Sequence, residues 1–355
     1  MNITFLIGNG FDIGMGMKSR FKDFFPIYEL LSKNKEPEIK QLSDEIDGNH
    51  ETWADFEAKL GEYTLKFTPE TKQNFINQIK DFEREFIKYL KDQEANLCFD
   101  DAEKISNTMK EALSNFYLNK NLAKLSENKL KDLFSAHFLD EHIYNFINYN
   151  YTSVLSDALN TIPQTIVRKR KTVRGDRNDK IGEIVNVHGK CNSNPIIGLN
   201  DVSQIANKEL AKDERFTRLI VKPSLTQLLR QGNDTEATNL IKTSTIICVY
   251  GMSLGVTDKK WWDLILSWLN GNAERQLVIF DYDEEYTSST QFEWLEKEDY
   301  FIDKLIKYNT NTSVDVEKLR PRIHLAIHKN IFALDLAEKS NKITELAIEK
   351  VLVNV

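Results

Sequence analysis

The stretch of sequence that decides the fold is Ile3-Thr4-Phe5-Leu6-Ile7-Gly8-Asn9-Gly10-Phe11-Asp12-Ile13-Gly14. Its apolar, β-branched beginning predicts a short buried strand that runs into a tight glycine turn, and a helical pattern follows the turn. A strand, a glycine turn and a helix can together hold a pyrophosphate, because glycines let the backbone approach the anion and the amides at the helix start face it. The dinucleotide-binding fingerprint is incomplete, since Ile13 stands at the position of its third glycine. A plain tight turn is therefore the alternative.

Five further short apolar segments predict strands of the same sheet. They lie at residues 143–149, 181–187, 245–250, 276–280 and 322–327, and helical stretches at 257–269 and 283–306 separate the last three. Alternation of strands and helices is typical of a parallel sheet with helices on both faces. The predicted fold class is α/β, a Rossmann-like parallel sheet with helices on both faces and an inserted all-helical subdomain.

The inserted subdomain is predicted from the change of texture over residues 34–141. This segment is highly charged, and its apolar side chains recur at steps of three and four residues, as from Phe75 to Leu90 and from Ile105 to Phe116. Such stripes are typical of long amphipathic helices packed as a bundle. We predict one α/β domain made of residues 1–33 and 142–355, and a helical insertion of residues 34–141 that acts as a lid or an assembly surface.

Composition narrows the classes of function. The 355 residues include 47 Lys and Arg against 54 Asp and Glu, a formal net charge of −7, which argues against a protein whose whole surface grips nucleic acid. Cys98, Cys191 and Cys248 form no CxxC pair, so neither a zinc ribbon nor a disulfide framework is expected. The N-terminal apolar run lacks a basic region before it and stops at Gly8. We therefore expect a cytoplasmic protein with no membrane partner.

One basic cluster stands out. It is the run Arg168-Lys169-Arg170-Lys171 with Arg174 and Arg177 nearby, and it falls between two predicted strands. We predict a loop there, either simply solvated or in contact with phosphates or nucleic acid.

Polar residues and glycines follow four of the predicted strands. In a doubly wound sheet, ligands bind at the carboxyl ends of the strands, so these residues are candidates for one site. They are Gly8, Asn9, Gly10 and Asp12, then Asn148, Asn150 and Thr152, then His188 and Gly189, and finally Gly251, Ser253 and Asp258. Because the pattern recurs at one predicted edge of the sheet, it indicates a single ligand site there.

His188 is the candidate general base. It lies directly after a predicted strand and before Gly189, and an imidazole titrates near neutrality, so it can take a proton from a hydroxyl or a water molecule. No metal is expected, because a third ligand is not apparent beside His137 and His142, or beside His324 and His328.

Ser253 permits a different interpretation. Gly251, Ser253 and Gly255 have the Gly-x-Ser-x-Gly spacing of an α/β-hydrolase nucleophile, and either Asp281 or Asp283 with either His324 or His328 could follow as acid and base. No oxyanion-hole segment such as His-Gly-Gly is present in the sequence, and the first glycine turn would have no role. We expect Ser253 to donate a hydrogen bond to a sugar or phosphate oxygen instead.

With these motifs, the sequence resembles the abortive-infection protein family AbiH, which is associated with bacterial defence against phage. The resemblance is carried by Ile7-Gly8-Asn9-Gly10-Phe11-Asp12, Trp53-Ala54-Asp55-Phe56-Glu57, Phe146-Ile147-Asn148-Tyr149-Asn150-Tyr151-Thr152, Val187-His188-Gly189, and Tyr250-Gly251-Met252-Ser253-Leu254-Gly255 with Asp258. These segments span most of the chain, from residue 5 to about residue 270.

More distantly, the order of motifs is similar to sirtuin-like NAD-binding domains. That similarity implies that Gly8 and Gly10 contact the pyrophosphate, that Asn150 holds the nicotinamide-side ribose or a water molecule, and that His188 is the base. It also implies that Gly251 and Ser253 line the adenosine side.

Two departures from the sirtuin pattern matter. Thr152 stands where an acid follows the Asn, and Asp12 is a candidate to supply the missing carboxylate. The four-cysteine zinc module of protein-deacylating sirtuins is missing from the sequence, so peptide deacylation is not expected.

The resemblance therefore implies an anti-phage effector that binds NAD and hydrolyses its nicotinamide–ribose bond when activated. A homo-oligomer is expected, with an activating defence partner or phage component. One alternative is a sensor that binds NAD or a related nucleotide without cleaving it. Another is an RNA-directed toxin or nuclease that uses the basic segment from Arg168 to Arg177.

Overall fold

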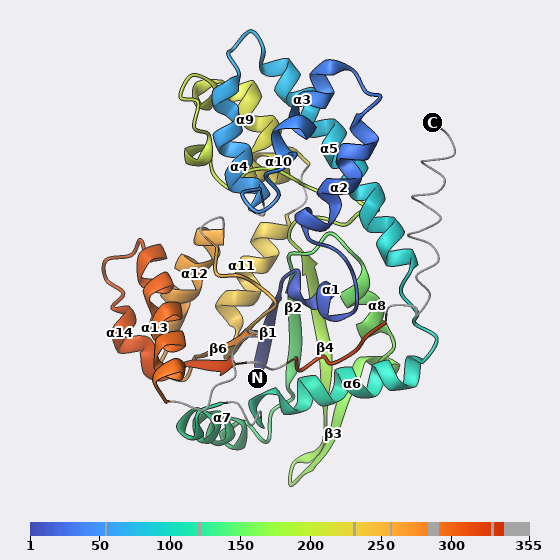
Figure 1. The fold of residues 1–355 in the computed structure, drawn as a ribbon. Coiled ribbons are helices and arrows are strands. Elements are labelled where there is room, and N and C mark those ends of the chain that lie inside the picture. Colours follow the sequence, from blue (N-terminus) through green and yellow to red (C-terminus); the bar gives the residue numbers. More distant parts are fainter. Residues whose placement is uncertain are drawn as a thin grey trace.

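A seven-stranded sheet forms the centre of the molecule (Figure 1). The structure is a computed structural model that describes residues 1–336 except 54, 119–121, 230–231, 256–257, 283–290 and 328–329. The strands run in the spatial order β3-β4-β2-β1-β5-β6-β7. Their bounds are β1 (Asn2–Ile7), β2 (Ile143–Asn148), β3 (Ile166–Thr172), β4 (Gly175–Asn186), β5 (Ile246–Tyr250), β6 (Gln276–Asp281) and β7 (Ile323–Ile327).

The sheet is doubly wound. All neighbouring strands pair in parallel except β3, which pairs antiparallel with β4 at one edge. Apart from β3, the chain builds outward from β1 through β2 to β4, then returns to β5 on the other side of β1 and continues to β7. Ligands of such sheets bind where the winding reverses, which here is between β1 and β5. The predicted α/β class is confirmed, as are all five of the further strands.

Helices cover both faces of the sheet, and the side chains of β1 pack against the helices on each face in alternation. Ile3, Phe5 and Ile7 belong to one apolar core and Leu6 to the other, because side chains alternate along a strand. On the first face pack α1 (Gly10–Gly14), α6 (Ala102–Asn115), α7 (Lys124–Ala136) and α8 (Val154–Asn160). On the second pack α11 (Asn233–Thr243), α12 (Lys259–Asn270), α13 (Gln291–Tyr308) and α14 (Val316–Leu319).

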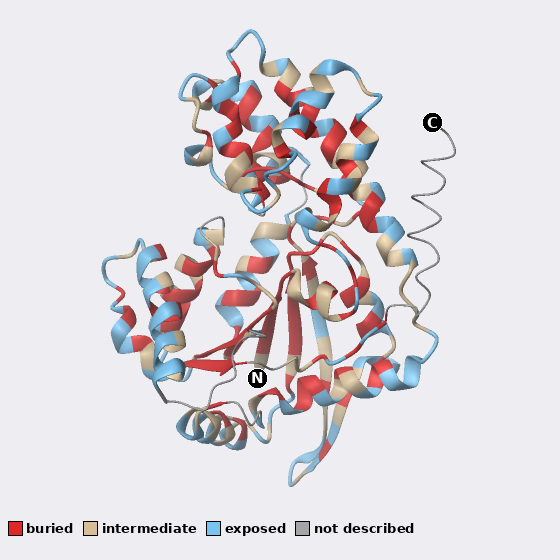
Figure 2. Cartoon of the chain, viewed as in Figure 1, coloured by how far each residue is buried: buried red, intermediate tan, exposed pale blue. Residues whose placement is uncertain are grey.

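A separate helical lobe stands over the carboxyl ends of the strands (Figure 1). Its helices are α2 (Phe21–Ser32), α3 (Pro37–Ile46), α4 (Phe56–Tyr63), α5 (Lys72–Ala95), α9 (Glu214–Ile220) and α10 (Lys222–Leu228). Stacked aromatic rings form its core, with Phe56 against Phe82 at a centroid distance of 4.2 Å and against Phe21 at 4.8 Å. The inward faces of the helices are buried and the outward faces exposed, as their amphipathic stripes predict (Figure 2).

The helices of residues 34–141 divide between the two parts of the molecule. Helices α3 and α4 and much of α5 belong to the lobe, whereas α6 contacts β3 and α8 beside the sheet. Helices α9 and α10, which come after the predicted insertion in sequence, complete the lobe, and Phe216 of α9 packs on Phe75 of α5. The division into two domains stays a prediction.

The basic cluster is not a loop, and that prediction is wrong. Residues 166–186 form the β3–β4 hairpin, whose tip lies near Arg174. The cationic residues take a strand conformation because Asp179 of β4, which is fully buried, accepts hydrogen bonds from Arg168 and Arg170. Arg170 also donates to the carbonyl oxygens of Phe138 and Asp140.

A membrane-crossing helix is not found in the part of the chain that the structure describes: none of its helices combines the necessary length and apolarity.

Candidate functional site

A cavity of about 300 Å³ lies at the carboxyl ends of β1, β2, β4 and β5, where the sheet meets the helical lobe. From the sheet side it is lined by Gly8, Asn9, Tyr149, Asn150, Tyr151, His188, Gly251, Met252, Ser253, Gly255 and Asp258. From the lobe it is lined by Phe21, Asp55, Phe56, Glu57 and Lys222. We call it the small cavity. It occupies the point where the winding of the sheet reverses.

Two glycine turns form one wall of the small cavity. The amide of Gly8 donates to the carbonyl oxygen of Tyr250 at 2.9 Å, and the amide of Gly10 to that of Gly251 at 2.8 Å. Glycine is required at these contacts, since a Cβ on Gly10 would lie 2.6 Å from the Cα of Gly251. The amides of Gly8 and Gly10 are therefore engaged inside the protein, and these glycines allow the close packing of the two turns.

A buried network lies behind this wall. Asn150 donates its side-chain amide to the carbonyl oxygen of Gly8 at 3.2 Å and to Asp12 at 3.0 Å, and Thr152 donates to the other oxygen of Asp12 at 2.6 Å. Burial raises the pKa of Asp12 to about 7. The carboxyl group of Asp12 thus stands beside Thr152, but Asp12 is only 1% exposed and does not line the cavity.

His188 is held as a neutral imidazole. Its Nδ1 lies 3.2 Å from the carbonyl oxygen of Tyr149, which can only accept a hydrogen bond, so Nδ1 carries the proton and Nε2 presents a lone pair. Burial, followed by the charge of Lys222, holds the pKa of His188 well below its usual range. The rings of Tyr149 and Tyr151 flank the imidazole at centroid distances of 5.7 and 5.9 Å. The neutral imidazole can accept a proton at Nε2, and its lowered pKa makes it a weaker base than an exposed histidine.

The lobe contributes charged residues that the sequence analysis did not assign to the site. Glu57 accepts a hydrogen bond from Lys222, whose side chain is 5% exposed, and a second from Asn200 at 3.2 Å. Burial and the charge of Glu57 raise the pKa of Asp258 to about 7. Glu57 belongs to the Trp53–Glu57 segment that resembles the AbiH family, and this segment is the sequence feature that could have indicated Glu57 as a site residue. Lys222 and Asn200 lie in segments without a recognisable motif.

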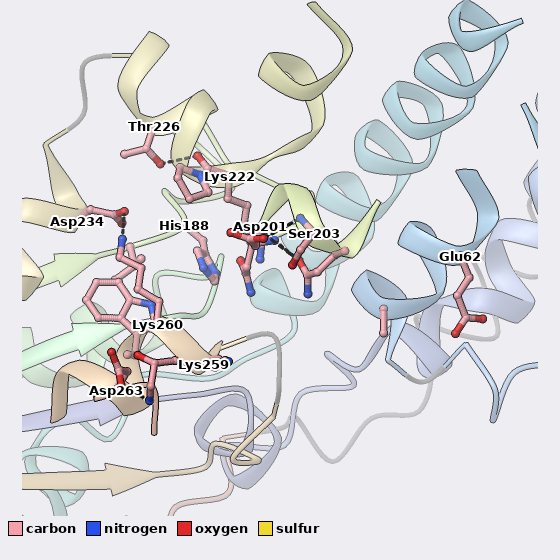
Figure 3. Close-up of a pocket in the computed structure, with 17 residues that line it drawn as sticks. Glu62, His188, Asp201, Ser203, Lys222, Thr226, Asp234, Lys259, Lys260 and Asp263 are labelled. Carbon is pink, nitrogen blue, oxygen red and sulfur yellow. Dashed lines mark hydrogen bonds and ion pairs between the residues drawn. The ribbon is translucent and has the colours of Figure 1, made fainter. Parts of the chain in front are cut away.

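A second cavity of about 840 Å³ adjoins the first, and His188 and Lys222 line both. Figure 3 shows Lys222 and Asp201 on one side of this large cavity and Lys260 and Asp263 on the other, with His188 between them. Lys260 is paired with Asp234 at 2.7 Å. The imidazole therefore stands at the junction of two compartments.

The structure brings seven of the twelve predicted site residues to the small cavity. They are Gly8, Asn9, Asn150, His188, Gly251, Ser253 and Asp258. The other five, Gly10, Asp12, Asn148, Thr152 and Gly189, support its walls. Asn148, which is fully buried, donates to Asn186 at 3.1 Å and accepts from the amide of Asn150 at 3.2 Å. Gly189 has a φ of +72°, and a Cβ there would lie 2.1 Å from a carbonyl oxygen.

The hydrolase triad of the alternative interpretation does not form from the described residues. His324 is the second residue of β7 and hydrogen-bonds Gln276, the first residue of β6, at 2.8 Å. This places His324 at the amino end of the parallel strands, whereas Ser253 follows the carboxyl end of β5. Asp283 and His328 lie outside the described residues. Within the same described part of the chain, no group of three or more His, Cys, Asp or Glu side chains could hold a metal ion.

The chain matches the model of a known protein family. The model of the family described as "Bacteriophage abortive infection AbiH" matches residues 4–280, which is more than half of the chain. The matched range includes every residue that lines the small cavity. No curated protein matches the chain.

Proposed function

Because this chain belongs to the AbiH family of bacteriophage abortive infection, we propose that it acts in that defence by hydrolysing NAD at the bond between nicotinamide and ribose. The observation that carries the proposal is the position of His188. A neutral imidazole with a free Nε2 lines a cavity that Asn150, two glycine turns and several carboxylates also line. This combination suits removal of a proton from water or a sugar hydroxyl.

The reaction would break the N-glycosidic bond, and its electron pair would leave with the ring nitrogen, so that cationic nicotinamide departs as a neutral molecule. A water oxygen would bond to the ribose carbon, and its proton would pass to Nε2 of His188. Both side-chain amide hydrogens of Asn150 are used by Gly8 and Asp12, so its carbonyl oxygen is the group that would accept a hydrogen bond from the ribose or the water.

The two adjoining cavities suit a substrate with two halves. The nicotinamide riboside half would occupy the small cavity and the rest of the dinucleotide would extend into the large one. The amides of Gly8 and Gly10 are engaged within the protein, so we propose that the side chain of Lys259, which lines the large cavity, holds the phosphates instead.

The test is nicotinamide release from NAD by the purified full-length protein, alone and with lysate of phage-infected cells. His188→Gln, which keeps polar atoms but removes the base, is expected to lose about 100-fold or more of the rate. Retained cleavage in His188→Gln would remove His188 from the mechanism. No cleavage by the wild-type protein under any condition would remove the enzymatic proposal.

A nucleotide sensor without catalysis is the second candidate, and the placement of Asp12 favours it. The carboxylate beside Thr152 lies behind the cavity wall and is almost wholly buried, so it cannot reach a ligand there without rearrangement. Isothermal titration with NAD separates the two candidates. Saturable binding with unchanged NAD recovered afterwards selects the sensor.

We further propose that the protein works in the cytoplasm as a homo-oligomer and is switched on by a defence partner or phage component. An NADase must be silent in healthy cells, and the helical lobe, which supplies residues to the site, is the part of the molecule through which activation would act. Light scattering before and after addition of infected-cell lysate tests the oligomer, and a monomer in both conditions contradicts it.

A further inference from the structure

Glu57 is a carboxylate of the small cavity that the reaction above leaves without a role. It lies in the first turn of α4, in the helical lobe, facing the sheet residues that carry His188 and Asn150. The backbone around it is fixed, because Asp55 accepts a hydrogen bond from the amide of Ala58 at 3.2 Å and so caps the helix. The side chain therefore enters the cavity from the lobe at a defined position.

Two donors hold the carboxylate of Glu57. Lys222 at the start of α10 donates to Oε1, and Asn200 donates to Oε2 at 3.2 Å. Each carboxylate oxygen can accept a further hydrogen bond, so these contacts orient the group without exhausting it. The ion pair is largely buried, with the Glu57 side chain 15% exposed and that of Lys222 5% exposed. Buried ion pairs contribute little net stability because both charges lose their hydration.

If the Glu57–Lys222 ion pair served only to join α4 to α10, the position of Glu57 at the small cavity would have no explanation. Apolar side chains could join two helices without the cost of desolvation. Glu57 instead lines the same cavity as Asp258, Asn150 and His188, and Lys222 is its ion-pair partner. Fixed charges aimed at the position where opposite charge develops are a large source of catalysis.

We infer that Glu57 stabilises the positive charge that develops on the substrate in the small cavity, and that Lys222 and Asn200 position it for this purpose. The inference rests on the proposed function, in which departure of nicotinamide leaves an oxocarbenium-like ribose. The lobe is thereby part of the active site, since the sheet alone does not supply this carboxylate.

The test uses full-length protein and the variant Glu57→Gln, which removes the charge and keeps the shape. Glu57→Gln is expected to lower kcat for NAD about 100-fold with little change in KM. Because this variant leaves Lys222 buried without its counter-ion, the double variant Glu57→Gln/Lys222→Met restores charge balance. Glu45→Gln, which breaks an ion pair with Lys66 elsewhere in the lobe, is the matched control.

A second measurement does not depend on turnover. The wild-type protein is expected to bind the 1-methylnicotinamide cation more tightly than neutral nicotinamide in a calorimetric titration. The preference for the cation is expected to fall about 10-fold in Glu57→Gln and to persist in Glu45→Gln.

The outcomes separate the two claims. The inference is supported if the wild-type protein cleaves NAD, Glu57→Gln has a low kcat, and the double variant has a normal melting temperature but does not recover activity. Recovery of activity in the double variant, or normal kcat in Glu57→Gln, overturns it and leaves the proposed function intact. If the wild-type protein cleaves no NAD, the proposed function fails, and the calorimetric titration then tests the role of Glu57. Loss of the preference for the cation in Glu57→Gln supports recognition of positive charge by Glu57. An equal preference in the wild-type protein and Glu57→Gln overturns it.

Discussion

The amide of Gly10 donates to the carbonyl oxygen of Gly251 at 2.8 Å, which joins the turn after β1 to the turn after β5. Gly10 and Gly251 are separated by most of the chain. The backbones of their two turns are nevertheless in contact, because β1 and β5 are the neighbouring strands between which the winding of the sheet reverses. A Cβ on Gly251 would lie 2.7 Å from the amide nitrogen of Phe11. The wall of the small cavity is therefore built from backbone, and side chains at these positions cannot be accommodated without displacement.

Substitution of Gly251 by Ala is expected to destabilise the protein. Gly251 has a φ of +67°, so Ala adds backbone strain as well as a clash with the turn at Phe11. We expect a loss of roughly 2–4 kcal/mol in the free energy of unfolding. Gly48→Ala is the control, because Gly48 has a similar φ of +70° but nothing within 4 Å of the added Cβ. Equal losses in chemical denaturation of the two variants would contradict the packing argument.

The edge hairpin depends on Asp179. Hydrogen bonds from His142 and Arg170 outweigh burial and hold the pKa of Asp179 well below its usual range. Asp179→Leu would leave Arg170, which is 8% exposed, as an unpaired buried charge, with an expected cost of about 3–5 kcal/mol. The double variant Asp179→Leu/Arg170→Met is expected to recover part of this loss in a denaturation experiment, because it removes the unpaired charge but also the hydrogen bonds from Arg170 to Phe138 and Asp140. No recovery would show that the hairpin does not rest on charge pairing.

The sheet was largely predictable from the sequence because its strands are short, apolar and end in glycine or polar residues. The β3–β4 hairpin was not, because its run of Arg and Lys has the composition of a solvated loop. Its strand character depends on Asp179, a contact from the partner strand. Periodicity within a segment carries no information about such a compensating charge.

The site was predictable to the extent that strand ends define it. His188 and Asn150 were found because parallel strands bring their carboxyl ends to one edge of the sheet. Glu57 and Lys222 come from the lobe, and only tertiary packing places α4 and α10 over that edge. The expected phosphate-binding role of the Gly8 turn depended on free amides, and strand pairing between β1 and β5 brought Gly251 close enough to engage them.

Asp12 is expected to make stability depend on pH. Burial raises the pKa of Asp12 from 3.8 to about 7, so the folded state binds more protons than the unfolded state between these values. Its contribution to stability is therefore fully present below about pH 4 and is lost as pH rises through about 7. In Asp12→Asn, the melting temperature is expected to depend less on pH over this range. The difference from wild type corresponds to a few kcal/mol at most in the free energy of unfolding. A profile with an unchanged slope in Asp12→Asn would exclude Asp12 as the source.

Asp258 is expected to set the pH dependence of NAD cleavage. Burial and then Glu57 raise the pKa of Asp258 to about 7, and the other charged neighbours are Asp55, which also raises it, and Lys222, which lowers it. His188 stays neutral across this range because its pKa is lowered. In the proposed reaction, ionisation of Asp258 would add negative charge beside the ribose as it becomes positive, so kcat should rise as pH increases through about 7. Asp258→Asn should abolish this rise, whereas Glu45→Gln in the lobe should keep it. A rise near pH 7 that survives in Asp258→Asn would assign the titration to another group, and a wild-type rate that falls over the same range would contradict the neutral state of His188 or the role of Asp258.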